Sequence, residues 1–245
     1  MLEKKVIAVL GAGPGLGLSI ARRFGREGFA VALVSRSAAR QAAYREELSA
    51  AGIESRAYVA DVRDPVGLRD VLAAITPDLG PIDTVYFGPV AADTSGGLVP
   101  ITEVDAAAAR EPFETLVLPA IELVGAVLPE MTERGSGAIL IPGGLSGKYP
   151  IPMLGRLAPA SAALRMYVLT LHEALKERGV YVATLTIGGL IKGGDIHTAV
   201  SKHFEQLEAE MPASLDPELI ADQAWMMYVG RELPESEFST LPVPA

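Results

Sequence analysis

The glycines of the segment "GAGPGLG" (11–17) are the first residues whose spacing suggests chemistry. They follow a short apolar run and precede a pattern typical of an amphipathic helix. Glycines keep such a turn tight and let backbone N–H groups approach a pyrophosphate, while the partially positive N-terminus of the helix faces the anion. We therefore predict a nucleotide site, although a turn kept tight only for packing has the same pattern. The expected contacts are Gly11, Gly13, Gly15, Leu16 and Gly17.

Arg36 stands at the end of the second apolar run, in "LVSRSAAR". An acidic residue there would bind the ribose hydroxyls of NAD and repel a 2′-phosphate, whereas an arginine with neighbouring hydroxyls can hold that phosphate. We therefore expect NADP rather than NAD, held by Ser35, Arg36 and Ser37; a solvated loop arginine is the alternative. Asp61 and Val62 follow the third run and are expected to border the adenine, although Asp61 could instead cap a helix.

Two side chains in the second half of the chain are candidates for proton transfer. Tyr149 in "SGKYPIP" is a phenol with Lys148 beside it, and His197 lies in "GGDIHTAV". Either can exchange a proton with a substrate oxygen. We predict Tyr149 and His197 as the catalytic residues. The alternatives are that Tyr149 forms an aromatic wall of the pocket or a subunit contact, and that His197 is an exposed loop residue. We expect no metal site, because His197 and His203 have no fixed carboxylate partner.

Apolar runs and helical patterns alternate along the chain, and these elements must position the side chains named above. Strands are predicted at 5–10, 30–35, 55–60, 82–87, 137–142 and 180–187, and helices at 17–28, 37–52, 65–80, 112–134 and 161–179. This alternation predicts an α/β fold, a Rossmann-type doubly wound parallel sheet, in a single domain over 1–245. The weakly patterned segment 189–216 fits a lid over a pocket and a plain surface excursion equally well.

The composition limits the classes of function. The chain has 245 residues, 49% of them hydrophobic, and a formal net charge of −9, so no global basic field favours nucleic acid or an anionic membrane. The absence of cysteine excludes disulfides and thiolate chemistry. No apolar run reaches the roughly 18 residues typical of a membrane span, and the first residues resemble a buried strand rather than a signal peptide. We expect a cytoplasmic protein.

The order of these motifs resembles the short-chain dehydrogenase/reductase family over residues 5–190. "GAGPGLG" is similar to the family's glycine motif, "DV" at 61–62 to its adenine contact, and "ERGVYVATLTIGGLI" to the strand and loop that close over the nicotinamide. The resemblance implies a small-molecule substrate and a homodimer or homotetramer, with the helices at 112–134 and 161–179 as a possible interface. It also implies cofactor contacts at Gly88, Ile187 and Lys192, where Lys192 replaces a threonine.

The catalytic residues that the resemblance implies do not carry over. The family's asparagine falls near Leu116, its serine on Gly144, its tyrosine on Leu157 and its lysine on Ser161. In the family the tyrosine exchanges a proton with the substrate oxygen, the lysine lowers its pKa and the serine orients the carbonyl. We therefore expect a divergent member with an unusually apolar pocket, suited to an apolar organic ligand.

Three functions remain open from the sequence. The first is an atypical NADP(H)-dependent oxidoreductase in which Tyr149, His197 or water supplies the proton. The second is a non-redox enzyme on the same fold, such as a cyclase, isomerase or dehydratase. The third is a non-catalytic NADP-binding protein. Asp93, Thr94 and Ser95, after the fourth strand, are possible substrate contacts or ordinary turn residues.

Overall fold

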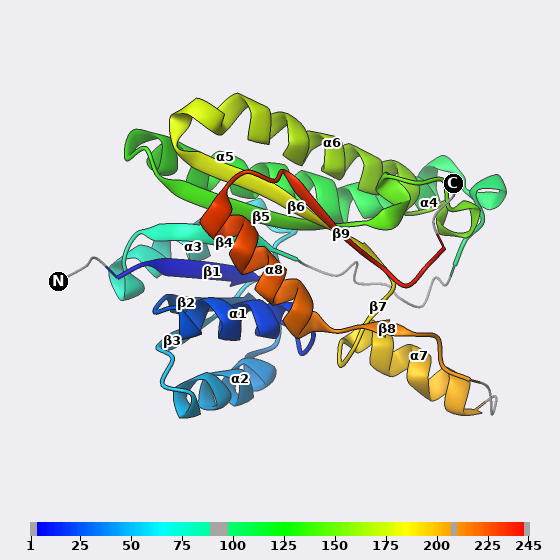
Figure 1. The fold of residues 1–245 in the computed structure, drawn as a ribbon, viewed down its shortest axis with the longest axis horizontal. Helices are drawn as coiled ribbons and strands as arrows, with labels where there is room; N and C mark the ends of the chain where they lie inside the picture. Colours follow the sequence, from blue (N-terminus) through cyan, green and yellow to red (C-terminus); the bar gives the residue numbers. More distant parts are fainter. Residues whose placement is uncertain (1–3, 89–97, 207–209, 243–245) are drawn as a thin grey trace.

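Seven parallel strands form one sheet in the order β3-β2-β1-β4-β5-β6-β9 (Figure 1). The computed structural model describes residues 4–88, 98–206 and 210–242. The strands are β1 Val6–Leu10, β2 Ala30–Ser35, β3 Ser55–Val59, β4 Ile82–Phe87, β5 Gly137–Gly144, β6 Val180–Gly188 and β9 Glu235–Ser239. The strand order reverses between β1 and β4, because β2 and β3 lie on one side of β1 and the later strands lie on the other. Open α/β sheets bind ligands at such a switch point. The predicted doubly wound Rossmann sheet is confirmed.

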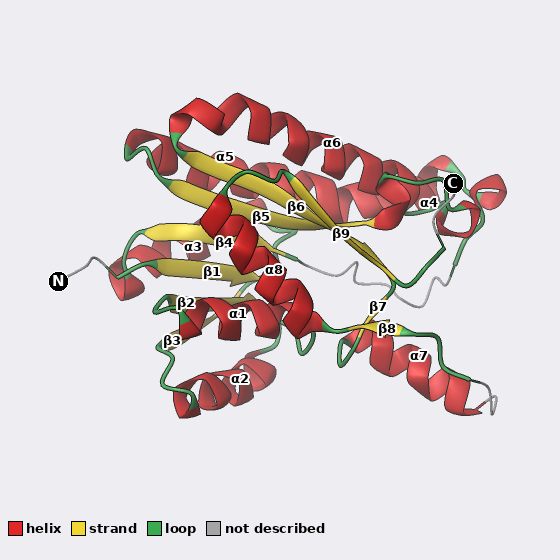
Figure 2. Ribbon diagram, in the orientation of Figure 1, coloured by secondary structure: helices red, strands yellow, loops and turns green. Residues whose placement is uncertain are grey.

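Helices cover both faces of this sheet (Figure 2). One face packs against α1 Leu16–Arg26, α2 Ala38–Ala50 and α8 Pro217–Gly230, and the other against α3 Pro65–Leu79, α5 Leu118–Glu133 and α6 Ala158–Leu175. Alternate residues of the five strands between β3 and β9 therefore enter two separate hydrophobic cores. In β6, for example, Val182 belongs to the core under α6 and Ala183 to the core under α8.

Side-chain caps fix where several helices begin. Ser37 caps α2, Asp64 caps α3 and Asp216 caps α8, each by accepting a hydrogen bond from a backbone N–H of the first turn. In α3 and α8 a proline occupies the first helical position, where its missing N–H removes no helical bond. The capped starts of α2 and α3 keep the loops after β2 and β3 short, and both loops lie at the carboxyl edge of the sheet.

The predicted helix at 112–134 is longer and less regular than its pattern suggested. It begins as α4 Ala106–Pro112, widens into a π-helical turn at Phe113–Val117 and continues as α5. Pro119 has no N–H to bond the carbonyl of Thr115, which is compatible with a wider turn. The stretch Ala106–Glu133 is long and apolar enough to cross a membrane by length and composition alone. Its buried side chains, including Leu123 and Met131, belong to the hydrophobic core.

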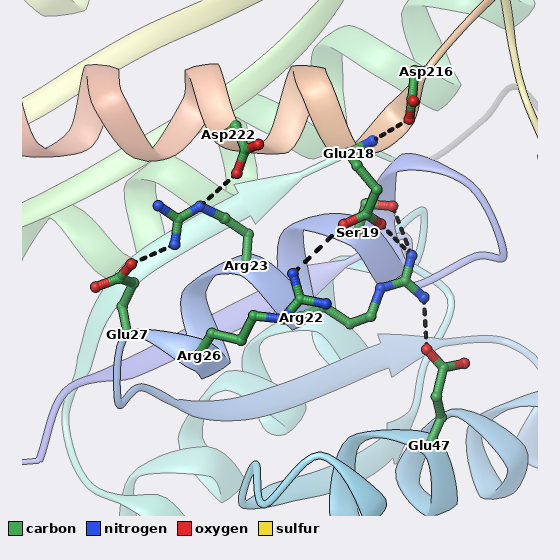
Figure 3. Close-up of polar contacts among 9 residues, drawn as sticks. All are labelled: Ser19, Arg22, Arg23, Arg26, Glu27, Glu47, Asp216, Glu218 and Asp222. Atoms are coloured by element: carbon green, nitrogen blue, oxygen red, sulfur yellow. Dashed lines mark hydrogen bonds and ion pairs between the residues drawn. The ribbon is translucent and has the colours of Figure 1, made fainter.

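The last helix and strand were not predicted from the sequence. Strand β9, "ESEFS", is rich in charged and polar residues and pairs in parallel with β6. Helix α8 packs along α1 through the aromatic contact of Phe24 with Trp225 and through polar contacts, which Figure 3 shows. Arg22 of α1 reaches both Glu218 of α8 and Glu47 of α2, and Arg23 pairs with Asp222 at 2.7 Å. Burial opposes ionisation of Glu218, but hydrogen bonds from Ser19 and Arg22 outweigh it and lower its pKa.

The segment after β6 leaves the main body of the molecule. It forms a short parallel pair, β7 Leu190–Ile191 with β8 Ser214–Leu215, and the helix α7 Asp195–Gln206. No residue of α7 is buried, and Figure 1 shows this helix extending beyond the end of the sheet. The segment is thus attached to the body mainly near the start of α7.

Candidate functional site

Two clefts lie at the carboxyl ends of the strands and meet at the glycine turn. The first, here called the arginine cleft, has a volume of about 560 Å³ and is bordered by the ends of β2 and β3. The second, here called the apolar cleft, has a volume of about 330 Å³ and is bordered by the ends of β4, β5 and β6. Gly11, Gly13 and Asp195 line both.

The glycines of the turn after β1 differ in what the structure requires of them. Gly11 has a φ of 88°, a left-handed conformation that favours glycine, and its N–H bonds the carbonyl of Val34 at 3.0 Å. A Cβ on Gly17 would stand 2.5 Å from the carbonyl oxygen of Gly11, so this glycine is required for packing. A Cβ on Gly13 would meet nothing closer than 3.8 Å, which leaves open space above the turn. Gly15, Leu16 and Gly17 line the apolar cleft.

The arginine cleft contains the predicted phosphate-binding residues Ser35, Arg36 and Ser37. Arg36 is exposed and makes no hydrogen bond or ion pair with another described residue. The hydroxyl oxygen of Ser35 is buried and has no hydrogen-bond partner. Arg40, in the first turn of α2, also lines this cleft, and its guanidinium pairs with the carboxylate of Asp195 at 2.6 Å. The Arg36 cation is therefore open to a ligand on this side, while the unpaired Ser35 hydroxyl lies buried in the cleft wall.

Asp61 and Val62 line the same cleft. The Asp61 carboxylate accepts hydrogen bonds from the Arg63 side chain, the shortest at 2.6 Å, and from the Arg63 backbone N–H. Mainly through the side-chain bond, and against the effect of burial, Arg63 lowers the pKa of Asp61 to about 2. Asp61 is thus a fixed negative charge, and the cap of the following helix is Asp64 instead.

Large apolar side chains surround the second cleft. Leu116 comes from the π-helical turn, Leu157 from the residue before α6 and Leu164 from α6 itself. Residues from the end of β6 and the segment after it complete the wall, namely Ile187, Leu190, Ile191 and Ile196. Its floor has little side-chain bulk, because Gly88 follows β4 and Gly143 and Gly144 end β5.

Few polar side chains face this apolar cleft. Tyr86, Ser161, Asp195 and His197 are the polar side chains among its described lining residues. Burial raises the pKa of the Tyr86 phenol, so it stays protonated. His197, one of the two predicted catalytic residues, enters from α7.

Two other predicted site residues lie apart from both clefts. Tyr149 is half-buried and is not among the described lining residues; its ring lies 5.4 Å from the ammonium of Lys148, which pairs with Glu237 at 2.8 Å. Lys192 is exposed, and only its backbone N–H is engaged, by the carbonyl of Leu215. The candidates Asp93, Thr94 and Ser95 lie outside the described residues. The structure therefore brings His197, but not Tyr149, to the glycine turn.

Comparison with known proteins identifies the family of this chain. The short chain dehydrogenase model matches residues 5–203. The chain belongs to the short-chain dehydrogenase family. The ketoacyl reductase HetN of Nostoc sp. is 30% identical over 201 residues, which cover 82% of this chain and 69% of that protein. The NADP-dependent 3-hydroxy acid dehydrogenase YdfG of Salmonella typhi is 27% identical over 227 residues, 90% of this chain and 87% of that protein. Its relatives are thus oxidoreductases.

The fold of this short-chain dehydrogenase is shared with solved structures. A crystal structure of an actinorhodin polyketide ketoreductase variant with NADPH has a TM-score of 0.84 at 20% identity, covering 98% of this chain and 97% of that chain. The four positions at which the resemblance implies asparagine, serine, tyrosine and lysine all border the apolar cleft. They hold Leu116, Gly144, Leu157 and Ser161.

Several residues of the two clefts were not predicted from the sequence. Arg40 lies in the first turn of α2, three residues after its cap Ser37, and the Ser37 cap was a signal that this turn starts directly after Arg36. Tyr86 was counted only as part of a strand, although it is two residues before Gly88 and so shares its face. Within the described residues, no group of three or more histidine, aspartate or glutamate side chains is arranged to hold a metal ion.

Proposed function

We propose that this protein is an NADP-dependent oxidoreductase that acts on an apolar organic carbonyl compound or alcohol. The main support is that the two clefts meet at Gly11 and Gly13. A dinucleotide laid across this turn would have its phosphate-bearing end beside Arg36 and its other end between Leu116 and Leu157. A reduced nicotinamide supplies a hydride there to a carbonyl carbon, while the carbonyl oxygen takes up a proton.

The preference for NADP rests on the chemistry of the arginine cleft. Among the residues that the structure describes, Arg36 has no ion-pair partner and the buried Ser35 hydroxyl has no hydrogen-bond partner. A 2′-phosphate would satisfy Arg36, because its oxygens accept charge-assisted hydrogen bonds from arginine. The NADP-dependent dehydrogenase of Salmonella typhi and the ketoreductase structure with NADPH are consistent with this preference.

The proton is proposed to come from a group other than the family's usual one. Leu157 offers no proton, and Ser161 offers no cation to a neighbouring phenol. Among the predicted catalytic residues, His197 lines the apolar cleft, so it is our first choice. Tyr149 stays a candidate that would need the loop after β5 to move, because its ring now lies beside Lys148.

We also propose that residues 189–216 act as a lid. A Cβ on Gly15 would stand 3.1 Å from the Cα of Gly194, so the segment rests directly on the glycine turn. The ion pair between Arg40 and Asp195 joins α2 to the start of α7. Because α7 contributes no buried side chain, few contacts oppose its movement. Opening would expose the floor of both clefts.

The test is NADPH oxidation with a panel of apolar ketones, imines and enones at high protein concentration. We expect slow turnover of at least one class, with the oxidised cofactor and the reduced product in equal amounts. If none of these compounds is turned over while NADPH binds, the oxidoreductase proposal fails.

A second candidate follows from the same lining residues. With Leu157 and Ser161 in the cleft, a non-redox enzyme or a non-catalytic NADP-binding protein would have the same nucleotide contacts. Product formed without a change in NADPH absorbance would favour the non-redox enzyme. NADPH binding with no product from any substrate would favour the binding protein.

We further propose a homodimer or homotetramer. Leu118 and Ile121 lie one turn apart on α5 with 53% and 41% of their surface exposed, and Met166 of α6 has 59% exposed. Large exposed apolar side chains on neighbouring helices are typical of interaction surfaces. Light scattering should give a mass above the monomer for the native protein and a monomer for the variant Leu118→Glu/Ile121→Glu.

A further inference from the structure

We propose that the hydroxyl groups of Ser161 and Ser146 together bind the oxygen atom of the apolar ligand. The identity of that ligand as a carbonyl compound or alcohol rests on the proposed function. The site itself rests on two serine hydroxyls that lie near the same point over Gly144, a residue that lines the apolar cleft.

The geometry is set around Gly144, the last residue of β5. A Cβ on Gly144 would stand 3.1 Å from the Ser161 hydroxyl oxygen and 3.6 Å from the Ser146 hydroxyl oxygen. Glycine leaves this space empty, and both Gly144 and Ser161 line the apolar cleft. An oxygen atom of a ligand seated over Gly144 would therefore be within reach of a hydroxyl group.

Both serine residues are largely buried, and their hydroxyls have no internal partner within the described residues. Ser161 has 4% and Ser146 has 8% of its surface exposed. Neither side chain makes a hydrogen bond with another residue in the described parts of the chain. Neither hydroxyl oxygen is fully enclosed, so each can exchange a water molecule for a ligand oxygen. A ligand oxygen would supply the missing partner.

The backbone around the pair is built for close approach. Ser146 lies in the single 3₁₀ turn Leu145–Gly147, and Ser161 lies in the first turn of α6. A Cβ on Gly147 would stand 2.5 Å from the backbone carbonyl of Ser161, so only glycine lets this turn rest on the helix. Packing thus brings both serines to the space over Gly144, and a ligand would not have to break a hydrogen bond between their hydroxyls.

The surroundings specify the chemical class of the ligand. Leu116, Leu157 and Leu164 line the same cleft, so the hydroxyl pair is a small polar point in an apolar wall. A hydrogen bond is stronger in such a low-dielectric setting than in water. A serine hydroxyl can donate to a carbonyl and accept from an alcohol, so one site serves both oxidation states. The site therefore selects one oxygen on an otherwise apolar skeleton.

The experiment moves the hydroxyl instead of only removing it. We would compare the wild type with Ser161→Ala, Ser161→Thr and the double variant Gly144→Ser/Ser161→Ala, in which residue 144 supplies the hydroxyl. The probes are 2-tetralone and its oxygen-free analogue tetralin, titrated by calorimetry into the protein saturated with NADP⁺. Thr170→Ala is the matched control, because that hydroxyl lies on α6 but bonds the carbonyl of Met166 within the helix.

We expect Ser161→Ala to weaken 2-tetralone binding about 10-fold and to leave tetralin binding unchanged, as for the loss of one hydrogen bond. The threonine variant and the double variant should restore 2-tetralone binding to within a few-fold of the wild type. Thr170→Ala should bind both probes as the wild type does. A melting temperature within a few degrees for each variant shows that binding changes are not caused by unfolding.

Two results would overturn the proposal: equal binding of 2-tetralone by wild type and Ser161→Ala, or no preference of the wild type for 2-tetralone over tetralin. Turnover separates this inference from the proposed function. If Ser161 governs ketone binding but NADPH is never oxidised with any ketone, the hydroxyl site stands and the oxidoreductase function fails. If ketones are reduced at unchanged rates by Ser161→Ala, the function stands and the hydroxyl site fails.

Discussion

At the scale of single residues, three arginines line the arginine cleft, and their partners decide which of them can take a new anion. Arg40 is paired with Asp195, and Arg63 is paired with Asp61. Arg36 has no ion pair within the described residues. Since an arginine already bound to a carboxylate must first be released, Arg36 is the cation that an incoming phosphate reaches first.

Arg36→Asp tests this assignment. The substitution replaces a charge-assisted hydrogen bond to the 2′-phosphate with repulsion, so we expect NADPH binding to weaken about 10- to 100-fold. NADH binding should be unchanged or improved, because an acidic residue there can bind the ribose hydroxyls. Fluorescence titration measures both affinities. Arg69→Asp, an exposed arginine on α3, is the control; equal losses for NADPH and NADH in Arg36→Asp would show that Arg36 does not contact the phosphate.

His197 and Tyr149 can be separated by kinetics. If His197 transfers the proton, His197→Gln should lower kcat about 10²-fold or more at unchanged NADPH affinity. Tyr149→Phe should then stay within a few-fold of the wild type, because its ring lies beside Lys148 and not in the cleft. His203→Gln on the same helix is the control. A large effect of Tyr149→Phe with none of His197→Gln would reverse the assignment.

At the scale of elements, the segment that includes α7 combines close packing at one end with exposure along its length. Gly194 rests on the glycine turn, and Asp195 bridges to α2. Beyond this point α7 has no buried residue. A helix attached in this way opens at low free-energy cost, because few apolar contacts have to be broken. The Arg40–Asp195 pair is therefore the main polar contact that holds the start of α7 over the clefts.

Asp195→Asn should loosen this attachment without unfolding the protein. Both side chains of the pair are more than half exposed, so the pair contributes only about 0.2–1 kcal/mol and the melting temperature should barely change. We expect hydrogen exchange in residues 195–206 to rise a few-fold in the free protein. Glu205→Gln, an exposed position on the same helix, should leave exchange unchanged. Unaltered exchange in Asp195→Asn would mean that the packing of Gly194 alone holds the segment.

At the scale of the whole molecule, β9 completes the sheet through charged side chains. Glu235 accepts two hydrogen bonds from Arg165 of α6, at 2.8 and 2.6 Å, and one from Thr186 of β6 at 2.5 Å. The bond from Arg165 is the largest influence and lowers the pKa of Glu235, although burial opposes it and Thr186 adds to it. The C-terminal strand is thus tied to α6 and β6 by an ionised carboxylate.

The pH dependence of stability tests this tie. Because the pKa of Glu235 is lower in the folded than in the unfolded state, its contribution is fully present above about pH 4.5, the unfolded value, and is lost as the pH falls through the folded pKa. Urea unfolding at pH 7 should show Glu235→Gln to be less stable by about 1–3 kcal/mol. This difference should shrink below pH 4.5. Glu232→Gln, which is exposed nearby, is the control, and a difference independent of pH would contradict the assignment.

The glycine turn and the six predicted strands could be identified from the sequence because their signals are local. Gly11 needs a positive φ and Gly17 needs a missing Cβ, and both requirements arise within seven residues of chain. The period of apolar residues likewise depends only on neighbours in sequence. Strand β9 was missed because Glu235 and Glu237 have poor strand propensity, and only Arg165 and Lys148, far away in the chain, compensate their charges.

By itself, then, the sequence determined the doubly wound sheet, the glycine turn and the position of Arg36 at the end of β2, because each depends on residue type at short range. The tertiary structure decided which side chains meet. It placed His197 in the apolar cleft and Tyr149 outside its described lining, and it set Asp195 against Arg40. It also left the Ser161 hydroxyl facing the space over Gly144. Such encounters depend on packing between segments far apart in the chain, which local patterns do not encode.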